Sequence, residues 1–243
     1  MTDDDVRPGR RYLEHVSRLI DRVAAEEWTS IAHAARLVAD ALAGGRAIHA
    51  FGSGHSHMLA EEMFYRAGGL VDVRPILFEG LMLHADALMS TSLERLPGLA
   101  AVILDGHGVE SGDVLFVFSN SGRNPVTVEL AEAAMSRGVS VIAITSRRHS
   151  ESIAPRGGEH RLFEVVDVVV DNGGEPGDAA IHVTGFDRAV APTSTAVGAA
   201  IINAIVAEAV ALTVDAGVTP RVFASSNIDD GDAINALLLE RRG

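Results

Sequence analysis

Apolar residues near the start of the chain recur with helical spacing. They stand three or four positions apart over residues 12–23 and again over residues 31–42, which predicts two helices or one bent helix. Gly44 and Gly45 then end the pattern, as glycines commonly do after a helix. We therefore expect residues 1–45 to form a helical N-terminal extension that packs against the rest of the molecule.

Beyond residue 45, short apolar runs alternate with segments of helical pattern. The runs, which we expect to be strands, cover residues 46–51, 71–78, 114–118, 139–145 and 165–170. Helical patterns cover residues 58–66, 125–135 and 189–212, with loops expected over 147–161 and 173–177. Runs that are apolar at consecutive positions are typical of parallel strands buried on both faces. Residues 46–243 are therefore expected to form one α/β domain with a doubly wound parallel sheet.

The composition excludes several classes of function. The 243 residues carry a formal charge of −13, which disfavours nucleic acids and anionic membranes as partners. Aromatic residues make up only 5% of the chain, too few for a surface that stacks on single-stranded nucleic acid. The chain has no Cys and no Lys, since all 20 basic side chains are Arg. Disulfides, thiolate nucleophiles, lysine Schiff bases and lysine-dependent phosphate loops are therefore excluded.

Two features bear on a membrane location, namely the charge at the start of the chain and the longest apolar segment. The chain opens on an acidic run, residues 3–5, where an export signal would be basic, so we expect a cytoplasmic protein. The segment 189–212 comes closest to a membrane span, but Arg188, Asn203 and Glu208 interrupt it. We interpret it as a buried or dimer-forming helix.

Two polar loops that contain glycine follow predicted strands. Loop 1, residues 52–56, follows the first strand, and loop 2, residues 119–124, follows the third. Their candidate ligand-binding residues are Ser53, Gly54, Ser56, Ser119, Asn120, Ser121 and Asn124. Free backbone N–H groups, hydroxyl groups and a helix N-terminus together form an anion site that needs no lysine. We expect a pocket for a phosphate group, the alternative being two ordinary strand-to-helix turns.

These loops resemble a known family. Residues 119–122 (Ser-Asn-Ser-Gly) resemble the Ser-x-Ser-Gly phosphate loop of the SIS (sugar isomerase) domain, and residues 51–56 (Phe-Gly-Ser-Gly-His-Ser) resemble its first glycine loop. The resemblance spans roughly residues 30–215. It implies a five-stranded parallel sheet sandwiched by helices, binding of a phosphosugar, and a homodimer whose active site takes residues from both subunits.

A smaller group within this family shares further segments with the chain. Residues 54–69 and 222–231 are similar to stand-alone proteins labelled phosphosugar isomerases, and this group is similar to an N-acetylglucosamine-6-phosphate dehydratase. Arg66 stands where phosphoheptose isomerases and an N-acetylmuramic acid 6-phosphate etherase carry a catalytic glutamate. The chain also contains no Gln, and no His over residues 196–209, where those isomerases bind metal. We therefore expect neither a metal nor a cofactor.

Candidate catalytic residues lie close to loop 1. Glu62 is the candidate base because it stands six positions beyond Ser56 on the helix that leaves the loop. The alternative for Glu62 is an ion pair with Arg66 at the next helical turn. His55 and His57 flank the loop serine and are candidates for donating to the sugar oxygens.

Further candidates lie elsewhere on the same predicted edge of the sheet. Glu79 and His84 follow the second predicted strand, and each is a candidate acid for a departing hydroxyl group. Thr193 and Ser194 form a natural cap for the late helix, and the family resemblance also places them near the sugar. Arg123 in loop 2 is either a phosphate ligand or a solvated loop residue.

The chemistry that suits these residues begins with removal of the C2 proton from an open-chain sugar phosphate. Return of a proton at C1 isomerises the sugar, whereas loss of the C3 hydroxyl group dehydrates it. We expect a carbon–oxygen lyase that dehydrates N-acetylglucosamine 6-phosphate. An aldose–ketose isomerase similar to phosphoheptose isomerase is the first alternative, and a non-catalytic sugar-phosphate sensor is the second. Besides the substrate, the expected partner is a second copy of the chain.

Overall fold

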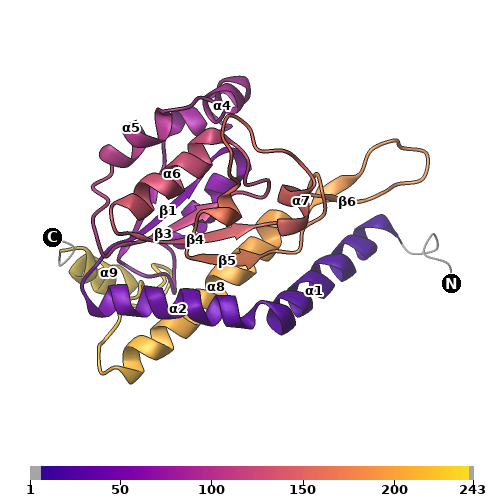
Figure 1. The fold of residues 1–243 in the computed structure, drawn as a ribbon. Helices are drawn as coiled ribbons and strands as arrows, with labels where there is room; N and C mark the ends of the chain where they lie inside the picture. Colours follow the sequence, from indigo (N-terminus) through magenta and orange to yellow (C-terminus); the bar gives the residue numbers. More distant parts are fainter. Residues whose placement is uncertain (1–6, 241–243) are drawn as a thin grey trace.

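The chain folds around one parallel sheet (Figure 1). The computed structural model describes residues 7–240. Five strands lie in the order β2-β1-β3-β4-β5, and every neighbouring pair is parallel. They are β1 (Ile48–Gly52), β2 (Val73–Ile76), β3 (Val114–Phe118), β4 (Ser140–Thr145) and β5 (Val168–Asp171). Each overlaps an apolar run identified in the sequence, which confirms the predicted doubly wound α/β fold.

Strand β3 shows why its apolar residues are consecutive. All five of its residues are buried. Leu115 and Val117 belong to the core on one face of the sheet, whereas Phe116 and Phe118 belong to the core on the other face. Because side chains alternate across a strand, a strand covered on both faces leaves no position for an exposed polar residue.

Helices cover both faces of the sheet. Figure 1 shows α2 and α8 on one side and α5 and α6 on the other. The first layer contains α1 (Pro8–Glu26), α2 (Trp28–Ala43), α3 (His57–Met63) and α8 (Ser194–Asp215). The second layer contains α5 (Leu99–Asp105) and α6 (Pro125–Ser136). Each layer shares a separate apolar core with the sheet, so the molecule has three layers.

The N-terminal segment forms two helices that break at Glu27. Ile31, Ala35 and Val38 of α2 are buried in the core that the sheet shares with α8. Helix α2 therefore belongs to the same layer as the late helix, and the N-terminal segment packs directly on the domain.

Residues 147–161 differ from the prediction of a loop, because they begin with the short helix α7 (Arg147–Glu151). The Ser146 hydroxyl oxygen caps α7 by accepting a hydrogen bond from the His149 amide at 3.1 Å. The remaining α-helices of the described residues are α4 (Ala87–Leu93) and α9 (Gly231–Glu240). Helix α4 lies in a stretch that shows no clear apolar period.

The late apolar helix begins later than predicted. Strand β7 (Val190–Pro192) occupies the start of the expected helical segment and pairs antiparallel with β6 (Ala179–Ile181). Figure 1 shows this hairpin projecting beyond the sheet, on the same side as α1. The Tyr12 hydroxyl group donates to the Pro192 carbonyl oxygen at 2.8 Å, which ties α1 to the hairpin.

Within residues 7–240, α8 is the one helix long and apolar enough to cross a membrane by length and composition. Seven of its residues are buried against the rest of the molecule, as in a core helix of a globular domain. The acidic run at residues 3–5 lies outside the described residues, so the cytoplasmic location stays a prediction.

Candidate active site

Loop 1 turns sharply out of β1 at the edge where the carboxyl ends of the parallel strands meet. A Cβ atom at Gly52 would collide with the Ser56 carbonyl group, so only glycine fits there. Gly54 has φ +55°, in the left-handed region that glycine adopts without strain. The Ser56 amide donates to the Ser53 carbonyl oxygen at 3.1 Å, and the turn leads directly into α3.

Loop 2 leaves β3 at the same edge and leads into α6. The Ser119 hydroxyl oxygen accepts a hydrogen bond from the Gly122 amide at 3.1 Å, which closes the turn. Gly122 has φ +55°, so it also needs glycine. Pro125 begins α6 directly after Asn124, whose side chain makes no capping hydrogen bond. The positive end of the α6 dipole therefore lies at loop 2.

Buried polar atoms without a hydrogen-bond partner gather around loop 2. Seven side-chain atoms of this kind occur in the described part of the chain, and four of them belong to Arg123, Asn124, Thr127 and Ser150. Buried polar groups in folded proteins are nearly always paired, so a cluster of unpaired ones marks a place for a ligand or for water. Loop 2 and the two helices beside it thus contain buried polar atoms without a partner in the protein.

One carboxyl group connects the two loops. Glu94, which follows α4, accepts a hydrogen bond from the buried Ser53 hydroxyl group at 3.1 Å, and Asn124 also hydrogen-bonds to it. Burial raises the pKa of Glu94, against the opposing effects of Ser53, of nearby Arg95 and Arg156, and of Asn124. A partly desolvated carboxyl group between two polar loops has the properties of a general base. Glu94 is absent from the sequence-based candidates because no motif surrounds it.

A histidine lies next to loop 2 on the side of β4. His149 Nδ1 lies 3.5 Å from Asn120 Nδ2. Burial lowers the pKa of His149, Arg123 lowers it further, and Asp178 opposes the shift. The neutral imidazole is therefore favoured near neutral pH and can accept a proton. A signal for His149 exists in the sequence, since it follows the end of a predicted strand just as the two loops do.

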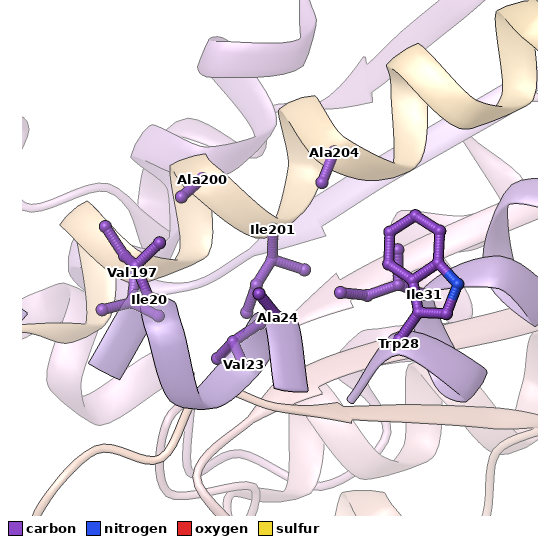
Figure 2. A pocket seen from close by; sticks show the side chains of 9 residues that line it. All are labelled: Ile20, Val23, Ala24, Trp28, Ile31, Val197, Ala200, Ile201 and Ala204. Carbon is purple, nitrogen blue, oxygen red and sulfur yellow. The ribbon is translucent and has the colours of Figure 1, made fainter. Parts of the chain in front are cut away.

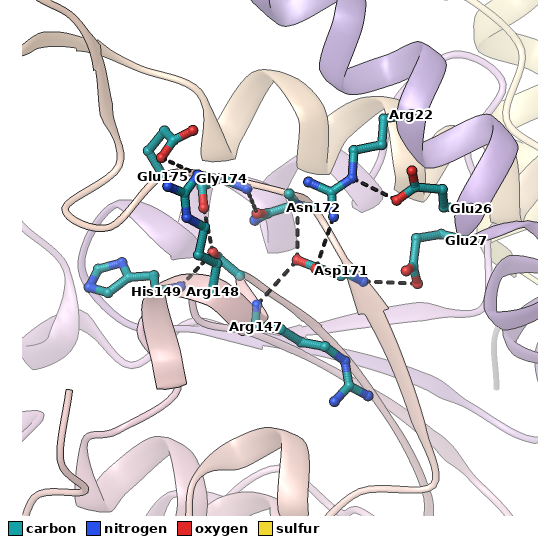
Figure 3. Close-up of polar contacts among 12 residues, drawn as sticks. Arg22, Glu26, Glu27, Arg147, Arg148, His149, Asp171, Asn172, Gly174 and Glu175 are labelled. Carbon is teal, nitrogen blue, oxygen red and sulfur yellow. Dashed lines mark hydrogen bonds and ion pairs between the residues drawn. The ribbon is translucent and has the colours of Figure 1, made fainter. Parts of the chain in front are cut away.

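A polar network at the end of β5 contacts loop 2, and Figure 3 shows the part of it around Asp171 and Asn172. The Asp171 amide donates to Glu27 Oε2 at 3.2 Å, and Arg22 lies 3.8 Å from the Asp171 carboxylate. The next residue, Asn172, donates through Nδ2 to Asn120 Oδ1 at 2.9 Å. The joint between α1 and α2 is thereby connected to loop 2, and this connection fixes the orientation of the Asn120 amide.

Thr193 is the N-cap residue of α8, as predicted, but the side chain that accepts from the helix amides is that of Asp178. Asp178 Oδ1 accepts hydrogen bonds from the amides of Thr193 and Ser194, at 3.1 and 2.9 Å, and the Ser194 hydroxyl group donates to Oδ2 at 2.6 Å. The Thr193 side chain makes no capping bond. The β6–β7 hairpin supplies a carboxylate, which is a stronger acceptor for the helix amides than a hydroxyl group. Contact of Thr193 and Ser194 with a sugar stays a prediction.

Glu62, the base predicted from the sequence, lies on α3 and faces α8. Its carboxylate pairs with Arg66 and accepts a hydrogen bond from Asn203 Nδ2 at 3.0 Å. The ion pair is the alternative that the helical spacing suggested. Within residues 7–240, no hydrogen bond links Glu62 to either loop. Its role as a base stays a prediction.

The other predicted catalytic residues surround loop 1. His57 is buried, and its Nδ1 donates to the Gly54 carbonyl oxygen. The ring of His84 packs edge-to-face on His57, with 6.0 Å between ring centroids. His55, His84 and Glu79 are exposed. Among the described residues, no group of three or more His, Asp or Glu side chains is arranged to hold a metal ion.

An apolar pocket of about 100 Å³ lies away from this polar edge (Figure 2). It opens between the joint of α1 and α2 and one side of α8, and Trp28, Ala200 and Ala204 are among its lining residues. Its lining offers almost no polar group, so it does not suit a phosphorylated sugar. Trp28 is 50% exposed in the single chain.

The three-layered parallel fold, with a serine-rich loop that leads into a helix N-terminus, defines the class of protein. The family model of the SIS domain matches residues 11–146, so the chain belongs to the SIS-domain family. Within it, the chain is 44% identical over 232 residues to the UPF0309 protein of Geobacillus thermodenitrificans, which covers 95% of this chain and 93% of the relative. It is 43% identical over 233 residues to the UPF0309 protein of Shouchella clausii, with 95% of each chain covered. The predicted resemblance is confirmed.

Solved structures share the fold at lower identity. Phosphoheptose isomerase GmhA from Neisseria gonorrhoeae has a TM-score of 0.53 and 18% identity, covering 84% of this chain and 95% of that one. The Vibrio vulnificus NanR protein complexed with ManNAc-6P has a TM-score of 0.52 and 19% identity, covering 89% of this chain and 68% of that one. These likenesses show the common SIS fold and nothing about the reaction.

Proposed function

We propose that the chain is an enzyme that binds the phosphate group of an amino-sugar 6-phosphate at loop 2 and dehydrates the sugar, with N-acetylglucosamine 6-phosphate as substrate. The observation that carries the proposal is the set of unpaired buried polar atoms of Asn124, Thr127 and Ser150 beside a carboxyl group that hydrogen-bonds to both loops. Membership of the SIS family supports the proposal. So does the neighbour of similar fold that was solved with ManNAc-6P.

The phosphate group is proposed to lie over the N-terminus of α6. Ser119 and Ser121 offer hydroxyl groups there, whereas the Asn124 side chain hydrogen-bonds to Glu94. Hydrogen bonds to a charged group contribute about 1.5–3 kcal/mol each. The net charge of −13 opposes an anion, but exposed charges beyond a Debye length of about 8 Å are largely screened. The local donors therefore outweigh the global charge.

Glu94 is proposed as the base. In the open-chain aldehyde, the C1 carbonyl group acidifies the C2–H bond. The Glu94 carboxylate takes the C2 proton, and the electron pair moves to the C1 oxygen as an enolate. When the enolate collapses, the C1 carbonyl re-forms, a C2–C3 double bond appears, and the C3 hydroxyl group leaves as water with a proton from Glu94. The raised pKa of Glu94 suits both steps. The carboxylate is a stronger base toward the C2 proton, and the resulting carboxylic acid keeps this proton until the C3 hydroxyl group leaves.

His149 is proposed to open the sugar ring. Its neutral imidazole, favoured by burial, can accept the proton of the C1 hydroxyl group, which opens the pyranose to the aldehyde. Asn120 lies next to this ring and is held by Asn172, so it can bind the same oxygen. The predicted candidates near loop 1, including Glu62, are alternatives for the transfers assigned to Glu94.

The runner-up is an aldose–ketose isomerase, because the same base and the same enolate serve both reactions. The two differ only in whether the proton returns at C1 or the C3 hydroxyl group leaves. An N-acetyl group at C2 favours elimination, since the ketose would require an imine-type tautomer. A free C2 hydroxyl group favours isomerisation.

The first test is incubation of the pure protein with N-acetylglucosamine 6-phosphate and with hexose and heptose 6-phosphates, followed by mass spectrometry. Loss of one water from the N-acetylated sugar, about 18 mass units, is the expected result. Unchanged mass with a changed retention time would favour the isomerase. Binding without any conversion would favour the sensor and contradict an enzyme.

The phosphate site has a separate test in Ser121→Ala. We expect it to weaken binding of N-acetylglucosamine 6-phosphate at least tenfold, because one charge-assisted hydrogen bond of about 1.5–3 kcal/mol is lost. Isothermal titration calorimetry measures the change. Ser136→Ala, at the far end of α6, is the matched control. Unchanged affinity in Ser121→Ala would remove loop 2 from the phosphate site.

A further inference from the structure

Beside loop 2 lies a polar cavity whose lining includes two arginines. It has a volume of about 260 Å³ and is bounded by the start of α6 and by residues 156–160. Arg123 and Arg156 both line it, and the Arg156 amide donates to the Arg123 carbonyl oxygen at 3.0 Å. None of the serines of loop 2 lines this cavity. It is therefore separate from the proposed phosphate site, although Arg123 belongs to the same loop.

These two arginines differ from most others in the molecule, because neither has a carboxylate within ion-pair distance among residues 7–240. The Nε atom of Arg123 is buried and has no hydrogen-bond partner at all. A buried donor of this kind costs free energy unless a ligand or water satisfies it. Glu94 acts on Arg156 only at longer range, and no side-chain hydrogen bond or ion pair engages Arg156 among the described residues.

Three glutamates also line the cavity, and two of them make contacts with other residues. Glu132 pairs with His160 at 3.2 Å, and Glu129 Oε2 accepts a hydrogen bond from the Gly98 amide at 2.8 Å. Glu159 is exposed to solvent. Among the described residues, none of these glutamates lies within ion-pair distance of Arg123 or Arg156.

Like charges also accumulate on this side of loop 2. Desolvation lowers the pKa of Arg156, and Arg123 and Arg95 lower it further, with only Glu94 opposing. Arg123 and Arg95 thus disfavour the charged form of Arg156, and Glu94 favours it. An anion in the cavity would relieve that repulsion.

We propose that this cavity is a second oxyanion site, in which Arg123 and Arg156 bind a phosphate or carboxylate group beside the first phosphate. The proposal rests on the proposed function for its first site only. A guanidinium pair suits such anions because each presents parallel N–H donors to two oxygens. The second anion comes either from a substrate with two acidic groups or from a separate small anion. In both cases it holds Arg123, and with it loop 2, in one conformation.

The decisive measurement is the number of inorganic phosphate ions bound per chain, by equilibrium dialysis at low ionic strength. We expect two for the wild type, one for Arg156→Gln and one for Ser121→Ala. Arg137→Gln, an arginine at the end of α6 that pairs with Asp105, is the matched control and should bind two. Circular dichroism of each variant checks that the fold is retained.

The possible results separate this proposal from the proposed function. One ion that is lost in Ser121→Ala and kept in Arg156→Gln would overturn the second site and leave the first intact. One ion that is lost in Arg156→Gln and kept in Ser121→Ala would support the cavity and remove the phosphate role of loop 2. Two ions that are both kept in Arg156→Gln would also overturn the proposal.

A second measurement identifies the source of the anion. Binding of a hexose 1,6-bisphosphate is compared with binding of the hexose 6-phosphate. If one ligand spans both sites, the bisphosphate binds at least tenfold more tightly, and Arg156→Gln abolishes the difference. If the anion is separate, the two sugars bind alike, and inorganic phosphate strengthens the binding of both in the wild type but not in Arg156→Gln. No effect of Arg156→Gln in either arm contradicts the proposal.

Discussion

Two buried ionisable side chains, His49 and Glu94, show how the surroundings of a residue separate a structural role from a chemical one. His49 is fully buried within the sheet, and its Nε2 lies 3.0 Å from Asp113 Oδ2. The Asp113 carboxylate also accepts the amide of Ala47 at 3.0 Å, so this pair belongs to the scaffold. Glu94 has no basic side chain within ion-pair distance among residues 7–240 and lies between two polar loops. The raised pKa that burial gives Glu94 therefore suits a role in proton transfer.

Glu94→Gln is expected to lower turnover by about 10²–10⁴-fold, the range for loss of a general base. The same variant should be more thermally stable than the wild type at pH 8. Burial raises the pKa of Glu94, so the fold disfavours the carboxylate, and this penalty grows as the pH rises through the folded-state pKa. The advantage of Gln should shrink as the pH falls toward 5. Turnover assays and calorimetry at both pH values check this.

The matched control is Glu240→Gln, an exposed glutamate on α9 that should leave turnover and stability close to wild type. Normal turnover in Glu94→Gln would exclude the residue as the base. Loss of turnover in Glu62→Gln but not in Glu94→Gln would instead identify Glu62 as the base.

The His49 site predicts a loss of stability in mild acid. Desolvation lowers the pKa of His49, which outweighs the hydrogen bond to Asp113, while Arg74 and His107 lower it further. The fold therefore prefers neutral His49. Its contribution is present above the unfolded-state pKa near 6.5 and is lost as the pH falls below that value. The thermal midpoint of the wild type should fall more between pH 7.5 and 5.5 than that of His49→Asn. Equal decreases would contradict this assignment.

At the scale of elements, the start of α8 depends on a residue from a different segment of the chain. Asp178 caps the helix with its carboxylate although its own φ is +68°, an unusual value for a residue other than glycine. The hydrogen bonds to Thr193 and Ser194 hold it in that conformation. The hairpin is thus connected to α8 by one side chain and to α1 by Tyr12.

Asp178→Ala is expected to destabilise the protein by about 0.5–2 kcal/mol, the usual range for loss of a helix cap. Thermal unfolding should then occur about 2–4 °C lower for each kcal/mol in a chain of this size. Asp187→Ala, in the exposed turn of the same hairpin, is the matched control. Equal stabilities of the two variants would show that the cap contributes nothing measurable.

At the scale of the whole molecule, the exposed apolar surface on one side suggests a second copy of the chain. Trp28 is half exposed above the pocket of Figure 2, and Leu13 on α1 is 69% exposed. Apolar groups of this size on the surface commonly mark an interface. The homodimer expected from the family resemblance stays a prediction, and this surface is where we place it.

Sedimentation at micromolar concentration should give twice the 25.5 kDa mass of the chain. Because Trp28 is the single tryptophan, its emission reports directly on this surface. Dilution below the dissociation constant should shift the emission to longer wavelength, as water reaches the indole. Ala204→Arg should give the monomer spectrum at every concentration, because it places a charge in the pocket. A fully active monomer would contradict the shared site.

The sequence alone predicted the parallel sheet, located the two polar loops and identified the family. Strands such as β3 are buried on both faces, and this leaves a continuous apolar run that can be recognised locally. Loop 2 was equally visible, because tight turns require glycine at particular positions such as Gly122. These features depend on the preferences of neighbouring residues and therefore appear in the order of the amino acids.

Only the tertiary structure showed that Glu94 lies between the loops and that Asp178 caps α8. It also showed one cavity lined by two arginines that form no ion pair among the described residues. Each of these contacts joins residues that lie far apart along the chain, such as Ser53 and Glu94 or Asp178 and Ser194. No local pattern encodes such a contact, because hydrogen bonding and desolvation depend on which groups meet in space rather than on which ones follow each other. The apolar pattern thus determined where the site lies, and the packing of distant segments decided which side chains occupy it.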